Sequence, residues 1–202
     1  MQRRHFGWAI LGLGLMAHCL SAEDKPQPTE AEKQAIAAIK KLGGNVMEIA
    51  QNDARLDVAF HLADSKIGDE QLALVKNLPR TTILNLRGTD ITDAGLANLK
   101  DLKGLTKLHL EKTKITDAGL EHLKGLENLE YLNLYGTQVT DAGLKQLEGL
   151  KKLKKLYLWQ TPVTDAGVAA LKATLPEVQI TRALELPKPE PKPEEKKPEE
   201  KK

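Results

Sequence analysis

The chain has 202 residues, of which 41% are hydrophobic and only 3% are aromatic. This composition predicts one domain of ordinary size with flanking tails, and its core must be filled by aliphatic side chains. Residues 1–22 contain two of the 30 basic residues and none of the 28 acidic ones, which leaves 28 of each in the rest of the chain. Balanced charge argues against nucleic acid as the main partner.

Residues 1–22 have the pattern of an export signal. Two arginines precede an apolar run over residues 6–17, and small residues follow it up to Ala22. The run is short for a membrane span, so we expect a mature chain with no membrane span that is secreted or held in the periplasm or cell envelope. The two arginines leave both the general and the twin-arginine export routes open. Cys19, the only cysteine, lies in this segment, and the mature chain can therefore form no disulfide.

Residues 23–55 are predicted to form an N-terminal linker and a cap. Thr29 and Glu32 have the spacing of a capping box, apolar residues follow at helical spacing, and Gly43 is a stop signal. A short strand should come next, then a turn near Asn52. The first full strand is predicted from four alternating apolar residues, which are Leu56, Val58, Phe60 and Leu62.

Residues 56–181 contain an internal repeat with a step of 24 residues. The step is set by Thr89, Thr113, Thr137 and Thr161, and a degenerate copy upstream places Ser65 at the same position. A fixed step of this size is typical of stacked supersecondary units, so the sequence predicts a solenoid.

Within each copy the spacing of the apolar residues changes once, from the alternation of a strand to the spacing of a helix. Leu108 and Leu110 alternate with other residues, as in a short strand with one buried face. Thr116 then suits a helix N-cap and Asp117 the positive end of the helix dipole. Gly119 is interpreted as room for close contact between neighbouring helices. Each unit should therefore be a strand followed by a helix.

The four strong copies, "LRGTDITDAGL", "LEKTKITDAGL", "LYGTQVTDAGL" and "LWQTPVTDAGV", resemble leucine-rich repeats of the cysteine-containing and ribonuclease-inhibitor-like classes. Threonine stands where those relatives commonly have Asn or Cys, as in secreted bacterial repeat proteins. The resemblance implies an α/β fold, a right-handed solenoid with a short parallel sheet on its concave face and helices on its convex face. The threonine hydroxyls are expected to bond to backbone groups of the next turn as a ladder.

Residues 182–202 are predicted to be a disordered tail. They hold five of the ten prolines among Lys and Glu residues, with no apolar residue after Leu186. Such a tail can be a solvated spacer or an arm that reaches a partner.

The few rings outside the signal are predicted to gather on the concave face. Phe60 belongs to the core, whereas the other four rings fall on outward positions of two adjacent strands and should form one continuous patch. Arg87 and Glu111 are expected as its polar rim. The predicted partner-binding residues are Trp159, Tyr157, Tyr135, Tyr131, Asn133, Glu111, His109 and Arg87. Alternatively, the segment after the last strand, or the tail, covers the rings.

No catalytic group, cofactor site or metal site is predicted. His61 and His109 are expected as exposed residues two strands apart in one column, too far apart to share a metal ion. The sequence lacks a paired nucleophile and base and a phosphate-binding loop. We therefore expect an exported non-enzymatic module that binds a protein through its concave face. The alternatives are a polysaccharide-binding module of the cell envelope and a structural spacer tethered by the charged tail.

Overall fold

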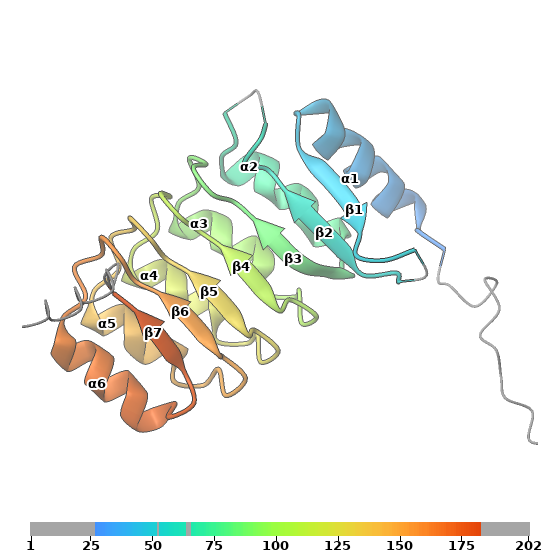
Figure 1. Cartoon of the computed structure of the whole chain (residues 1–202). Helices are drawn as coiled ribbons and strands as arrows, with labels where there is room; N and C mark the ends of the chain where they lie inside the picture. Colours follow the sequence, from blue (N-terminus) through green and yellow to red (C-terminus); the bar gives the residue numbers. More distant parts are fainter. Residues whose placement is uncertain (1–26, 52, 64–65, 183–202) are drawn as a thin grey trace, which may run out of the picture.

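The computed structural model describes residues 27–51, 53–63 and 66–182, and these form a solenoid around one sheet (Figure 1). The predicted export signal and residues 183–202 of the predicted tail lie outside the described residues. The strands follow one another in chain order across the sheet. They are β1 (Asn45–Glu48), β2 (Leu56–Ala59), β3 (Thr81–Asn85), β4 (Lys107–His109), β5 (Tyr131–Asn133), β6 (Lys155–Tyr157) and β7 (Gln179–Thr181). Only β1 is antiparallel to its neighbour, and the later pairs are parallel.

The helices cover one face of this sheet, and the other face, the predicted concave face, carries none (Figure 1). The α-helices are α1 (Glu30–Lys41), α2 (Asp69–Leu72), α3 (Asp93–Leu96), α4 (Asp117–Leu120), α5 (Asp141–Leu144) and α6 (Asp165–Thr174). The helices α2 to α5 are single turns, and each continues as a 3-10 segment. These segments are η2 (Ala73–Asn77), η3 (Ala97–Leu99), η4 (Glu121–Leu123) and η5 (Lys145–Leu147). The predicted α/β solenoid of strands and helices is confirmed.

The core is a stack of aliphatic side chains repeated from turn to turn. In the turn that begins with β5, Leu132, Leu134 and Val139 are completely buried, and Leu144 and Leu147 close the same layer from the helical side. Each buried leucine contributes about 1.5–3 kcal/mol relative to an exposed one, and the neighbouring turns supply the contacts that a single turn lacks.

The repeated threonines after the strands do not link neighbouring turns, so that prediction is wrong. The Thr113 hydroxyl donates to the Leu110 carbonyl three residues earlier, at 2.7 Å. Thr89, Thr137 and Thr161 do the same in their own repeats. The short side chain folds back and closes the bend after its own strand, while backbone bonds such as Lys112 N–H to the Tyr135 carbonyl join the turns.

A ladder between turns is built instead by the aspartates at the helix starts. Asp93 Oδ1 accepts from the Thr116 backbone N–H at 2.8 Å, and its Oδ2 accepts from the Thr116 hydroxyl at 2.6 Å. The pairs Asp69–Thr92, Asp117–Thr140 and Asp141–Thr164 repeat this geometry. The helix-start position was predicted for Asp93, Asp117 and Asp141 but not for Asp69, and the bonds to the next repeat were not predicted for any of them. We call these four pairs the aspartate ladder.

The repeated glycines leave space for this ladder. A Cβ added to Gly119 would lie 2.3 Å from Asp93 Oδ1, and one added to Gly143 would lie 2.3 Å from Asp117 Oδ1. Neighbouring helical segments do approach closely here, as predicted, but the atom that requires glycine is a carboxylate oxygen of the preceding repeat.

Replacing Asp117 by alanine should lower the free energy of unfolding by about 2 kcal/mol, because the Thr140 N–H and hydroxyl both lose their acceptor. Asp165 is the matched control, since it has the same place in its repeat but a fully exposed side chain that contacts only Arg182 among the described residues. Urea unfolding of both variants measures the difference. Equal effects of Asp117→Ala and Asp165→Ala would mean that the ladder does not stabilise the fold.

The N-terminal cap forms as predicted at its helix. Thr29 Oγ1 accepts from the Glu32 N–H at 3.2 Å, and the Glu32 carboxylate accepts from the Thr29 N–H at 2.7 Å, which completes a capping box. Glu32 also accepts from Arg80 Nε at 2.9 Å, and this ion pair fastens α1 to the segment before β3.

The stability of this cap should fall in acid. Desolvation raises the pKa of Glu32, but the hydrogen bond from the Thr29 N–H and the Arg80 guanidinium together lower it by more. The pKa of Glu32 therefore lies below its ordinary 4.5. Because its pKa is lower in the folded state, ionised Glu32 stabilises the fold. This contribution is fully present above pH 4.5 and is lost as the pH falls through the pKa of the folded state. The Glu32→Gln variant should show a flatter loss of stability below pH 4.5 than the parent chain. Glu30→Gln, whose side chain is 78% exposed, should keep the parent's slope.

The first repeat departs from the predicted strand pattern. Leu62 does not continue the alternation, since β2 ends at Ala59, the chain turns, and Leu62 is 68% exposed. Ala63 packs partly buried against the core. The strand register also shifts between Leu56 and Asp57, so Ala59 pairs with Asn85. His61 therefore does not share the column of His109.

The sheet ends with β7. Ile180 lies within this strand, while Val178 is buried just before it begins. The predicted alternative, that residues 181–186 or the tail cover the rings, concerns a segment that lies outside the described residues after Arg182.

Candidate functional site

The parallel register places outward residues of successive strands side by side on the concave face. One column contains Ile83, Lys107, Tyr131 and Lys155, and the next contains Asn85, His109, Asn133 and Tyr157. A third column, just after the strands, contains Arg87, Glu111, Tyr135 and Trp159. Backbone hydrogen bonds between neighbouring repeats continue through this column. Gly88 N–H donates to the Glu111 carbonyl at 2.8 Å, and Gly136 N–H donates to the Trp159 carbonyl at 3.0 Å.

The four rings form two groups rather than a single row. Tyr135 and Trp159 stack with their centroids 4.9 Å apart and their planes 13° apart. Tyr131 lies against Tyr157 at 5.3 Å and against the His109 ring at 4.8 Å, both tilted. The stack includes the most exposed ring of the site, since Trp159 is 37% exposed and the tyrosines are half-buried.

Asn133 connects the two ring groups. Its Nδ2 donates to the Tyr131 hydroxyl at 3.3 Å and to Glu111 Oε1 at 2.7 Å, while its Oδ1 accepts from the Tyr135 N–H at 3.1 Å. Burial raises the pKa of Tyr131 above its usual 10.0, although the bond from Asn133 lowers it in part. The phenol therefore remains protonated and uncharged at neutral pH. Together these bonds fix the floor of the site before any ligand arrives.

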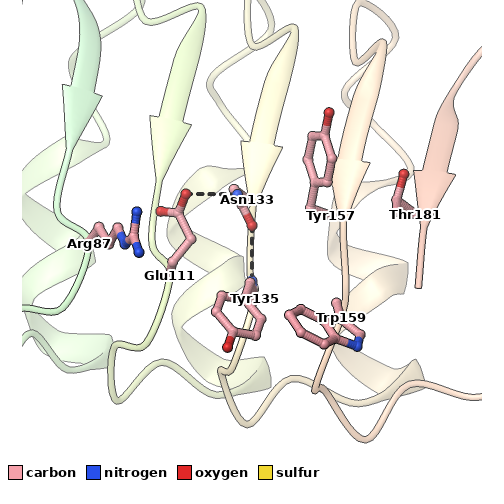
Figure 2. Close-up of a pocket in the computed structure, with 7 residues that line it drawn as sticks. All are labelled: Arg87, Glu111, Asn133, Tyr135, Tyr157, Trp159 and Thr181. Atoms are coloured by element: carbon pink, nitrogen blue, oxygen red, sulfur yellow. Dashed lines mark hydrogen bonds between the residues drawn. The ribbon is translucent and has the colours of Figure 1, made fainter. Parts of the chain in front are cut away.

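Glu111 is not part of an exposed rim, as was predicted, because only 6% of it is exposed. Its Oε1 also lies 2.9 Å from His109 Nδ1, so a residue of its own repeat and Asn133 of the next strand both hold it. His109, predicted to be an exposed polar residue, is consequently half-buried. Arg87 is exposed, as predicted, and lies beside Glu111 (Figure 2).

These side chains surround a hollow of about 310 Å³ on the concave face (Figure 2). Its walls are formed by Arg87, Glu111, Asn133, Tyr135, Tyr157, Trp159 and Thr181. Of the predicted partner-binding residues, Tyr131 and His109 do not line this hollow, but they contact its wall residues Asn133, Tyr157 and Glu111. Thr181 was missed, since β7 lies beyond the last strong copy of the repeat.

The hollow presents groups that can bind a ligand. It offers two stacked rings, a buried carboxylate and an amide. These can contact the apolar, cationic and hydrogen-bonding groups of a ligand. Within the three described stretches of chain, no cluster of three or more His, Cys, Asp or Glu residues could hold a metal ion.

Comparison with known proteins agrees with the repeat pattern. Residues 79–139 and 103–163 each match the leucine-rich repeat family model. None of the curated proteins matches the chain.

Among solved structures, the chain is similar to two internalins of Listeria monocytogenes. Internalin C2 is 31% identical over 54% of this chain and 44% of its own, with a TM-score of 0.46. Internalin InlF is 26% identical over 61% of this chain and 34% of its own, with a TM-score of 0.50. A leucine-rich repeat protein of Leptospira interrogans is 22% identical over 60% of this chain and 36% of its own, with a TM-score of 0.44. The chain thus spans less than half the length of each of these proteins.

Proposed function

Because this chain is a leucine-rich repeat protein, we propose that it is an exported, non-enzymatic module that binds another protein through its concave face. Leucine-rich repeat proteins generally mediate protein–protein interaction. The observation that carries the proposal for this chain is the Tyr135–Trp159 stack on the wall of an open hollow. Tyrosine and tryptophan are enriched where binding energy concentrates, and here they lie on the face without helices.

The anchors of the proposed surface are the rings, and the polar residues set its specificity. Trp159 and Tyr135 present stacked faces, and Tyr157 lines the same hollow. Tyr131 and His109 hold Tyr157 and Glu111 in place. Because the parallel strands pack against a fixed leucine core, these side chains are preorganised, and little conformational entropy is lost when a partner binds.

Export is the part of the proposal that rests on the N-terminal sequence. The arginines and short apolar run of residues 1–22 support it. In the part of the chain that the structure describes, no helix has the length and apolar character needed to cross a membrane. Intact-mass measurement of the chain recovered outside the cytoplasm should give a product that starts at Glu23. Recovery of the unprocessed chain in the cytoplasm alone would contradict export.

The proposal is tested by affinity capture on the immobilised chain from the native envelope fraction, followed by mass spectrometry. A captured protein must then bind as a purified component, and a soluble excess of the chain must displace it. Polysaccharides of the envelope are the second candidate ligands, because the exposed Trp159 face beside hydrogen-bonding groups also suits a sugar ring. A purified glycan that binds the hollow and displaces all captured protein would support that second function and contradict the first.

A further inference from the structure

One carboxylate oxygen of Glu111 accepts no hydrogen bond from the described residues. Its Oε1 is occupied by Asn133 and His109, but its Oε2 is buried and has no hydrogen-bond partner among the described residues. A buried carboxylate oxygen without a donor costs more than 1 kcal/mol, so native proteins rarely leave one unpaired without a functional reason. This side chain forms part of the wall of the open hollow (Figure 2).

The rings beside Glu111 already attract a cation. Lys112 Nζ lies 5.6 Å from the centroid of the Tyr135 ring. Tyr135 in turn stacks on Trp159, so the ring faces of this hollow have the negative potential that attracts positive groups. The buried carboxylate and the stacked rings therefore favour the same kind of ligand group.

Among the described residues, Arg87 is the one cation on the hollow's wall, and it does not pair with the carboxylate. No ion pair or side-chain hydrogen bond of Arg87 is present within the described ranges, although its backbone N–H donates to Asn85 Oδ1. Its exposed side chain lies next to Glu111 in Figure 2. No ion pair therefore holds the Arg87 guanidinium at this carboxylate.

From these observations, and resting on the proposed function, we infer that the hollow receives an arginine side chain of the partner protein. The guanidinium donates to Glu111 Oε2, and its stem and planar group lie along the Tyr135–Trp159 stack. Arginine suits this site better than lysine, because its flat, weakly hydrated head stacks on rings and still donates hydrogen bonds in its own plane. Charge pairing at a buried acceptor then adds specificity to the apolar contact of the rings.

The test uses the full 202-residue chain, labelled with ¹⁵N, and the probe Nα-acetyl-arginine methylamide. The Trp159 indole N–H resonance, assigned by its loss in Trp159→Phe, should shift and saturate as the probe is added. The citrulline analogue has nearly the same shape but no charge, and it should bind about tenfold more weakly or worse. The affinity of the Glu111→Gln variant for the arginine probe should fall by the same factor.

Glu121→Gln is the matched control, since it removes an exposed carboxylate on the helical side and should leave binding of the probe unchanged. Equal affinity for the arginine and citrulline probes, or no saturable shift at all, would overturn the inference. The citrulline comparison on the parent chain decides the matter if Glu111→Gln does not fold. Protein capture that requires the rings, together with a failed arginine titration, would remove this inference and leave the proposed function standing.

Discussion

Replacing Gly143 by alanine is expected to lower the free energy of unfolding by about 3 kcal/mol. The new Cβ would lie 2.3 Å from Asp117 Oδ1 and 3.0 Å from Val139 Cγ1. The carboxylate must then move, and its two bonds to Thr140 are strained or lost. A residue with a higher helix propensity than glycine thus becomes destabilising, because the cost arises between repeats and not within one.

Gly149 provides the matched control in the same repeat. It is exposed and has no atom within 4 Å of an added Cβ, so Gly149→Ala should leave the stability unchanged or raise it slightly. Urea unfolding followed by circular dichroism gives both free energies. If Gly143→Ala proves as stable as Gly149→Ala, the close packing of the aspartate ladder does not constrain the fold.

The double variant Trp159→Ala with Tyr135→Ala should weaken binding of the captured partner at least about 100-fold, since each buried anchor of an interface is commonly worth 2 kcal/mol or more. The fold should survive, because both rings lie outside the leucine core and the stack they form would be removed as a unit. Calorimetry gives the affinity, and the circular dichroism spectrum gives the fold.

The control for this variant is a second pair of exposed apolar residues on the same face. Met47 is 53% exposed and Leu62 is 68% exposed, and they share a separate hollow at the N-terminal end. Met47→Ala with Leu62→Ala should leave the affinity within about twofold of the parent. Loss of binding in this control pair, with full binding in the ring variant, would place the interface at the wrong end of the sheet.

The sequence predicts the architecture well because the core depends on a local pattern. The alternation of Leu108 with Leu110 and the 24-residue step are both visible along one chain, and together they define strand, turn and helix. The capping box of Thr29 with Glu32 is equally local. These features therefore appear in the structure where they were expected.

Contacts between polar groups of neighbouring turns were harder to predict. The Thr113 hydroxyl and the Asp93 carboxylate each had several partners within reach, and the sequence pattern does not distinguish them. The Thr113 hydroxyl closes the bend after its own strand, whereas the Asp93 carboxylate accepts from the N–H and hydroxyl of Thr116 in the next repeat. A recurrent Asp followed two residues later by Gly is the signal that could have indicated the ladder.

The same limit applies to the candidate site. The outward placement of Tyr135 and Trp159 follows from strand alternation, so their proximity could be predicted. The burial of Glu111 could not, because it depends on donors from His109 and from Asn133 on the adjacent strand. Thr181 at the edge of the hollow belongs to a repeat that departs from the 24-residue step.

The most direct measurement of the central claim is a chemical-shift map of the labelled chain with its purified captured partner. The concave-face account predicts that the largest changes fall on the Trp159 indole N–H and on amides near Glu111 and Tyr135. Amides of the helical segments α3–α5 on the opposite face should change little. Saturable binding whose largest changes lie on those helices, with an unperturbed Trp159, would contradict it.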